Sequence, residues 1–331
     1  MDLLPSSEQE QIIAMAMDFM AKELPLERIK AGQANAPSQE QWKAMADLGW
    51  FGIALHQELG GVGYGLVEEA LLFRAAGRFL APVSMLATSL AARLMASIGA
   101  QELLSSCLRG ECIIGLAVPE ADVSDADGGL SGRFRIIDGR GADFILFLSR
   151  ELAALCDGSL LDGCDERPCL DASATSCVLD LSGVRPAMMD RHTAQNLYAI
   201  GMTLTAALAV GVGEAICEMA VTQANNREQF GRPIGAFQAI KHPCADMAVR
   251  NEAAFSQTCY AALAIDCAHD DAFRQAAAAR FLAGQAALAS ARANIQIHGA
   301  LGVTDEFSAH LYLKRAHLLD VLFPASKGDL L

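Results

Sequence analysis

The spacing of hydrophobic residues changes twice along the chain. From Ser7 onward, over 40–48 and over 67–98, apolar residues recur every three or four positions, and Pro82 interrupts the last stretch. This period predicts amphipathic α-helices. Ser7 and Glu10 have the spacing of a capping box, which predicts the start of the first helix.

Near Cys107 the helical period gives way to short apolar runs. These runs are CIIGLAV, RFRIID, DFILFLS and SCVLDL, and Gly, Asp and Pro separate them. Short apolar runs between turn residues are typical of strands. The segment therefore predicts a small antiparallel β domain that closes near residues 184–188.

The helical period returns over 192–225, 237–268, 271–297 and 309–321. The predicted fold is therefore mainly α with a small β insert. We expect an N-terminal helical domain (1–106), a shortened middle β domain (107–190) and a C-terminal helical bundle (191–331).

Composition and charge limit the kinds of molecule that this chain is expected to bind. Hydrophobic residues make up 53% of the 331 residues and charged residues 19%, which favours burial against other subunits. The net charge of −14 argues against nucleic acid or an anionic membrane. The N-terminus shows no export signal, so we expect a cytoplasmic protein. The apolar window 197–216 contains Glu214 and lacks aromatic or basic flanks, which favours a buried bundle helix over a membrane span.

The cysteines and histidines do not indicate a metal site. In a chain without an export signal the ten cysteines are expected to be free thiols. Four of them cluster, but none forms a C-x-x-C pair, so zinc is disfavoured. The clustered cysteines are Cys156, Cys164, Cys169 and Cys177.

Two polar stretches interrupt the C-terminal helices. The first, NNREQFGRPIGAFQAIKH, places Arg227 and Arg232 in a connection that precedes a helix, where backbone N–H groups and guanidinium forks suit a phosphate. A solvated surface turn explains the spacing equally well. The second, QIHGALG (296–302), has glycines that either end a helix or let a ligand approach the backbone.

Together the two stretches resemble the acyl-CoA dehydrogenase family. Its R-x-x-F-G-x-x-I-x-x-F-Q motif is matched by REQFGRPIGAFQ, which begins at Arg227, and its Q-x-x-G-G-x-G motif by QIHGALG, with Ala300 replacing a glycine. WKAMADLGWFGIALHQELGG is similar to the N-terminal helical domain of that family, and the resemblance is weakest in the β insert.

The resemblance implies a three-part fold that ends in a four-helix bundle, and FAD shared between paired subunits. It implies α,β-dehydrogenation of an acyl-CoA thioester, with a carboxylate as the base. It assigns Arg227 to the pyrophosphate of FAD, and Gln238 with the 296–300 segment to the adenosine and pyrophosphate part. The cofactor-binding candidates are Arg227, Phe230, Gln238, Gln296, Ile297, His298, Gly299 and Ala300.

The chain departs from the family where the base is expected. The usual C-terminal position falls at Phe323 or Pro324, and the alternative position on the first bundle helix falls at Gly201. None of these residues can accept a proton. Asp320, one turn before Phe323, is the nearest candidate substitute.

The β insert departs from the family as well. The T-E-P element that contacts the flavin corresponds to Ala117-Val118-Pro119, which lacks the hydroxyl. The Trp-Ile-Thr/Ser element falls within 134–139, where no tryptophan or hydroxyl occurs. The ring-binding parts are therefore eroded, while the adenosine-binding parts are kept.

Three functions remain open from the sequence. The favoured one is a supporting subunit of a heterotetrameric acyl-CoA dehydrogenase that lacks its own catalytic glutamate. The first alternative is a self-sufficient FAD-dependent dehydrogenase with a displaced base. The second is a helical interaction protein without flavin, against which the intact 227–238 motif argues.

Overall fold

A computed structural model describes residues 5–30, 38–120, 123–124, 128–162, 164 and 167–330. The chain forms two units. One contains Met1–Gln33, Ala70–Ala81 and Met202–Leu331, and the other contains Ala34–Glu69 and Pro82–Gly201.

Helices come first along the chain, as predicted. They are α1 (Ser7–Glu23), α2 (Glu27–Lys30), α3 (Gln39–Asp47), α4 (Leu66–Arg78), α5 (Val83–Ser97) and α6 (Gln101–Leu108). Pro82 is the N-cap of α5, so the predicted interruption is real. The capping box of α1 was placed one residue too late, because Ser6 and Gln9 form it instead.

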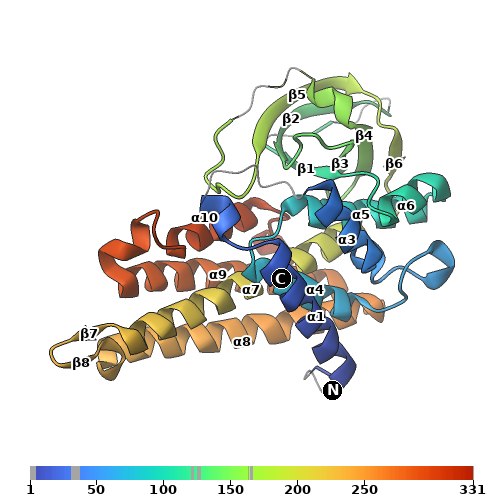
Figure 1. The fold of residues 1–331 in the computed structure, drawn as a ribbon. Helices are drawn as coiled ribbons and strands as arrows, with labels where there is room; N and C mark the ends of the chain where they lie inside the picture. Colours follow the sequence, from blue (N-terminus) through green and yellow to red (C-terminus); the bar gives the residue numbers. More distant parts are fainter. Residues whose placement is uncertain are drawn as a thin grey trace. The chain divides into compact units, whose positions relative to one another are not determined.

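Six strands follow and form one sheet in the order β5-β2-β1-β3-β4-β6 (Figure 1). The strands are β1 (Ile114–Pro119), β2 (Leu130–Ile137), β3 (Phe144–Leu148), β4 (Ala153–Asp157), β5 (Ser176–Val184) and β6 (Met188–Asp190). The sheet is mixed, so the prediction of a purely antiparallel domain was wrong. β1 lies between β2 and β3. It pairs antiparallel with β2 and parallel with β3.

Asp138 joins the end of β2 to two other segments of the same unit. Its carboxylate accepts hydrogen bonds from the backbone N–H of Val83 (2.7 Å) and of Thr175 (3.0 Å). The side chain of Pro82 cannot cap α5, so Asp138 supplies the acceptor that the first turn of this helix needs.

Four long helices end the chain: α7 (Ala194–Asn226), α8 (Gln238–Asp266), α9 (Ala272–His298) and α10 (Ala309–Val321) (Figure 1). Most residues that α9 buries are alanines or glycine, which lets neighbouring helices pack closely. Within the described part of the chain, α7 is the helix long and apolar enough to cross a membrane, but 89% of its apolar window is buried inside the protein. The fold is thus mainly α with a small β insert; the limits at residues 106 and 190 stay a prediction.

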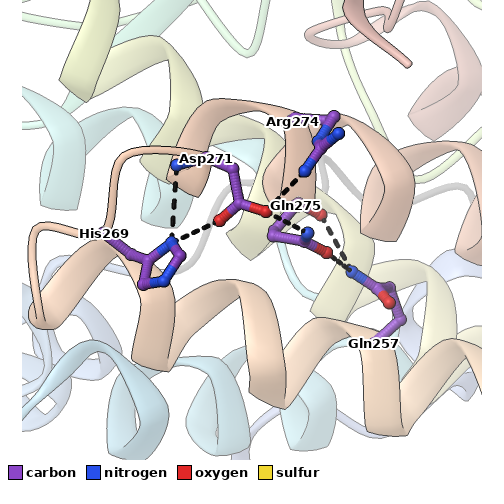
Figure 2. A network of polar contacts seen from close by, with 5 residues as sticks. All are labelled: Gln257, His269, Asp271, Arg274 and Gln275. Atoms are coloured by element: carbon purple, nitrogen blue, oxygen red, sulfur yellow. Dashed lines mark hydrogen bonds and ion pairs between the residues drawn. The ribbon is translucent and has the colours of Figure 1, made fainter. Parts of the chain in front are cut away.

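A polar network holds the connection between α8 and α9 (Figure 2). The carboxylate of Asp271 lies 2.5 Å from Nδ1 of His269 and accepts bonds from Arg274 (2.8 Å) and Gln275 (2.7 Å). The side chain of Gln257 on α8 donates to Oε1 of Gln275 (2.8 Å). The network fixes the first turn of α9 and ties it to α8.

Candidate functional site

The first polar stretch forms a tight hairpin after α7. Residues 228–229 (β7) pair with residues 232–233 (β8), and Phe230 and Gly231 both have positive φ, 54° and 75°. Two successive residues with positive φ match the twist of a two-residue hairpin turn. The side chain of Phe230 is 91% exposed.

Aromatic and cationic groups stack beside this hairpin. The guanidinium of Arg232 lies 4.3 Å from the ring centroid of Phe237, and the rings of Phe230 and Phe237 meet edge to face at 6.0 Å. Gln238 is the exposed first residue of α8. These contacts order the connection into α8.

The second polar stretch ends α9. Gly299 has φ 62° and ψ −137°, a conformation that glycine reaches far more readily than other residues. A Cβ on Gly302 would lie 2.9 Å from the carbonyl oxygen of Ile295. The glycines are therefore required by the turn itself. Ala300, which replaces the second glycine of the motif, is exposed in this turn.

Ile297 and His298 anchor the turn. Both are buried, and Nδ1 of His298 lies 2.9 Å from the carbonyl oxygen of Asn294. The imidazole packs against the ring of Phe307, with centroids 4.4 Å apart. The side chain of His298 thus holds the chain that follows α9 in place.

A cleft of about 490 Å³ lies where the ends of α7 and α9 meet. Its lining residues are Gln223, Arg227, Gln229, Ile234, Gln296, Ile297, His298, Gly299, Ala300 and Leu301. The structure therefore brings together Arg227 and the whole predicted 296–300 segment. Phe230 and Gln238 lie outside this set.

The electrostatics of the cleft suit an anion. Arg227 is exposed, and its guanidinium forms no hydrogen bond or ion pair with any residue that the structure describes. No carboxylate occurs among the described residues that line the cleft. An unpaired guanidinium in such a cleft can bind a phosphate through two parallel hydrogen bonds.

Four lining residues were not among the cofactor-binding candidates: Gln223, Gln229, Ile234 and Leu301. One signal could have found the first. Gln223 precedes Arg227 by four residues, and residues four apart lie on the same face of a helix. The other three lie within the two motif matches, Gln229 and Ile234 in the first and Leu301 in the second, but spacing alone does not show that they line one cleft.

The expected base positions hold no acid in the structure. Phe323 is buried, with φ 46°, and Pro324 is exposed. Gly201 lies in α7, and the side chain of its neighbour Met202 is fully buried.

Asp320, the candidate substitute, is engaged by Arg280. Its carboxylate is 48% exposed and lies 3.8 Å from the guanidinium of Arg280. That buried guanidinium donates to the carbonyl oxygens of Leu319 (2.5 Å) and Leu322 (3.0 Å), which are at the end of α10. Arg280 therefore caps the C-terminal end of α10, and Asp320 lies beside it as a counter-ion.

The sheet carries an ion pair whose arginine lies within the segment 134–139, where contacts to the flavin ring were expected. In β2, Phe134 and Ile136 are buried in the sheet core, and Arg135 between them lies on the opposite face. Arg135 donates to Oγ of Ser176 (3.2 Å) and pairs with Glu120 (2.5 Å).

These observations test how FAD fits the chain. The cleft at Arg227 offers an unpaired guanidinium and open backbone, as a pyrophosphate requires. The segments in which the resemblance places the flavin-ring contacts contain Ala117, Val118 and the ion pair of Arg135 with Glu120. The cleft at Arg227 thus has the groups that a pyrophosphate needs, and the segments expected to contact the flavin ring lack the expected hydroxyl and tryptophan side chains.

The cysteines stay apart from this site. Cys156 and Cys177 belong to the core of the sheet, and burial raises the pKa of Cys156 to about 11. None of the ten cysteines, all of which the structure describes, forms a disulfide bond. No group of three or more His, Cys, Asp or Glu side chains within the described ranges is placed to hold a metal ion.

Comparison with known proteins gives the family. The model of the acyl-CoA dehydrogenase N-terminal domain matches residues 6–110, and that of the acyl-CoA dehydrogenase C-terminal domain matches residues 193–322. The chain belongs to the acyl-CoA dehydrogenase family. Membership places it among oxidoreductases that act on acyl-CoA.

Curated relatives agree. Acyl-CoA dehydrogenase FadE34 from Mycobacterium tuberculosis is 32% identical over 286 residues, which are 82% of this chain and 38% of that protein. This chain therefore spans well under half the length of that relative. Acyl-CoA dehydrogenase IpdE2 from the same species is 28% identical over 324 residues, 95% of this chain and 92% of the relative.

Solved structures show the same fold. A chain of the ChsE4–ChsE5 complex from Mycobacterium tuberculosis superimposes with a TM-score of 0.85 at 24% identity, covering 100% of this chain and 97% of that one. Butyryl-CoA dehydrogenase from Megasphaera elsdenii gives a TM-score of 0.82 at 20% identity, covering 100% and 98%.

Proposed function

We propose that this chain is the supporting subunit of a heterotetrameric, FAD-dependent acyl-CoA dehydrogenase of the cytoplasm. It lends Arg227 and the 296–300 segment to the phosphate-bearing end of an FAD. A sister chain of the same fold holds the flavin ring and supplies the base. The assembled enzyme removes the α and β hydrogens of an acyl-CoA thioester.

One contrast carries the proposal. Arg227 and the 296–300 segment line one cleft, whereas the base positions hold Phe323, Pro324 and Gly201. A chain that keeps only the residues for the phosphates of FAD still has a function if a partner chain provides the flavin-ring contacts and the base. The same fold occurs in the ChsE4–ChsE5 complex, which supports an assembly of two different chains.

The chemistry divides between the two chains accordingly. FAD, when bound, accepts the hydride that leaves the β carbon. The residues of this chain act on the far end of that cofactor, where Arg227 neutralises phosphate charge and Gly299 lets the ligand approach the backbone. Phe230 is at the turn of the hairpin and Gln238 is the first residue of α8, and from these places they would contact the adenosine part.

The alternative of a self-sufficient dehydrogenase needs a base of its own. Asp320 is the acid nearest to the expected position, and Arg280 holds it at the end of α10. The second alternative, an interaction protein without flavin, does not explain why the unpaired Arg227 and the glycine turn after α9 line the same cleft. Both alternatives explain fewer of the retained features.

The test is the FAD content of the chain alone and after co-expression with a full-length homologue. We expect no flavin in the isolated chain and one FAD per pair of unlike chains in the complex. Arg227→Ala should lower the FAD content of the complex. Arg250→Ala is the matched control, because Arg250 is an exposed arginine of α8 outside the cleft.

Two results would contradict the proposal. One FAD per isolated chain, bleached by added acyl-CoA, would identify a complete enzyme. A complex of Arg227→Ala that keeps its full FAD content would remove Arg227 from the cofactor site.

A further inference from the structure

Gln223 lies one helical turn before Arg227 in the same cleft. The backbone N–H of Arg227 donates to the carbonyl oxygen of Gln223 (2.9 Å), so the helical path of α7 continues through both residues. Side chains four residues apart on a helix are neighbours, and both side chains line the cleft. They form a pair of a cation and a carboxamide.

α9 closes the cleft opposite this pair. The side chain of Asn294 contacts Sδ of Met219 at 3.4 Å, which fixes how α7 and α9 lie beside each other. Gln223 follows Met219 by one turn of α7, and His298 follows Asn294 by one turn of α9. Both Gln223 and His298 line the cleft. Gln223 is therefore placed at the junction of the two helices, deeper than Arg227 at the helix end.

The carboxamides of the cleft differ in their bonding. Nε2 of Gln229 donates to the carbonyl oxygen of Glu228 (2.7 Å). The side chains of Gln223 and Gln296 form no hydrogen bond with the residues that the structure describes. Gln223 is half-buried, so its amide is held near the ligand space without a partner inside the chain.

A carboxamide and a guanidinium recognise different groups. Five donors without an acceptor suit phosphate oxygens, whereas an amide both donates and accepts. Paired donor and acceptor groups occur on ribose and on a heterocyclic base, and inorganic pyrophosphate offers oxygen acceptors only. A cleft that needed to bind phosphate alone would have no use for the acceptor oxygen of Gln223.

We propose that Gln223 is a specificity-determining residue of this cleft. Its carboxamide hydrogen-bonds the nucleoside part of a nucleotide whose phosphates Arg227 binds. The cleft thereby selects a nucleoside diphosphate unit over pyrophosphate. This inference rests on the proposed function, because it assigns the same cleft to a dinucleotide cofactor.

Calorimetric titration of the chain with ADP and with inorganic pyrophosphate tests the inference. The variants are Gln223→Met, which keeps an unbranched side chain but removes the amide, and Asn225→Ala, which alters an exposed amide of α7 outside the cleft. Arg227→Ala reports on the phosphate site. Thermal melting of each variant shows that the fold is intact.

We expect ADP to bind more tightly than pyrophosphate to the unmodified chain. Gln223→Met should weaken ADP binding by roughly 2- to 12-fold, the value of one hydrogen bond, and leave pyrophosphate binding unchanged. Asn225→Ala should change neither. Equal weakening of both probes by Gln223→Met, or no change in either, would overturn the inference.

The outcomes also separate this inference from the proposed function. If Arg227→Ala changes neither probe while Gln223→Met weakens ADP alone, Gln223 is confirmed and the role of Arg227 is wrong. If neither probe binds the unmodified chain, this inference fails, whereas the proposed function is decided separately by the FAD content of the assembled complex.

Discussion

Gly211 of α7 lies directly against the main-chain carbonyl of Arg74 on α4. A Cβ at Gly211 would be 1.9 Å from that oxygen, and a Cβ at Gly77 would be 2.1 Å from the carbonyl oxygen of Leu208. The two helices therefore touch through their backbones at two places. Arg74 also pairs with Glu214 of α7 at 2.7 Å, so charge and close packing fix the same contact.

We expect Gly211→Ala to destabilise the protein by about 1–3 kcal/mol, the usual cost of overpacking a tight contact. The methyl group cannot fit without moving one helix, because its neighbour is backbone. Urea unfolding measures the change. Gly328→Ala is the control, since a Cβ there meets its nearest atom at an ordinary 3.7 Å. Equal stability of the two variants would show that α4 and α7 are not held at this contact.

The contact between α4 and α7 also shows what the sequence could predict. Glu214 stands in an apolar window, where its presence argued for a bundle helix and against a membrane span. The structure gives it two partners, Arg74 and Arg78, which are about 140 residues away. Helical period predicts that α7 exists, but it cannot say which helix supplies the counter-ions.

Tyr312 of α10 gives a prediction at high pH. Burial raises the pKa of Tyr312 to about 12, and its hydroxyl donates to the carbonyl oxygen of Arg78 (2.7 Å). The folded state holds this proton more tightly than the unfolded state, whose tyrosine titrates near 10. The stabilising contribution is therefore complete below pH ~10 and is lost as the pH rises towards 12.

Tyr312→Phe removes this titration. At pH 8 the variant should be less stable by about 1 kcal/mol, because the hydrogen bond is lost. From pH 8 to pH 11 the difference in stability between the two proteins should shrink by about 1 kcal/mol. At pH 11 Tyr312 of the unfolded, unmodified chain is ionised and must take up a proton on folding, whereas phenylalanine does not titrate. Urea unfolding at both pH values measures it. A constant difference would mean that Tyr312 is not buried in solution.

Asp271 gives a prediction at low pH (Figure 2). Hydrogen bonds from Arg274 and Gln275 hold the pKa of Asp271 well below its usual range. A depressed pKa means that the stabilisation is present above the unfolded value near 4 and is lost as the pH falls below it. Asp271→Asn should lower the urea midpoint at pH 7, and the difference should narrow at pH 3. Asp270→Asn, an exposed neighbour, is the control.

The helices were predicted more closely than the sheet, for a physical reason. The limits 309–321 of the last helix agree with α10, and the other bundle helices differ by one or two residues at their ends. Helices depend on local period and caps. Strand order depends on partners far along the chain, so β4 and β6 were missed and the direction of β3 relative to β1 was wrong.

The cleft shows the same division. Arg227 and the 296–300 segment were selected by resemblance, and the structure places them side by side. Gln223 entered only with the structure, because its membership depends on α7 continuing to Asn226 and on α9 ending beside it. The roles of these residues stay predictions until the binding experiments are done.

Asp320 distinguishes the supporting subunit from a self-sufficient enzyme. Because its carboxylate pairs with Arg280 at the end of α10, we expect Asp320→Asn to leave turnover and FAD content of the assembled enzyme unchanged. Arg280→Met should instead destabilise the chain by roughly 2–4 kcal/mol, because two buried carbonyl groups lose their donor. Steady-state turnover with an acyl-CoA and urea unfolding measure the two effects. Abolished turnover in a folded Asp320→Asn complex would make Asp320 a base, and this chain would then carry an active site of its own.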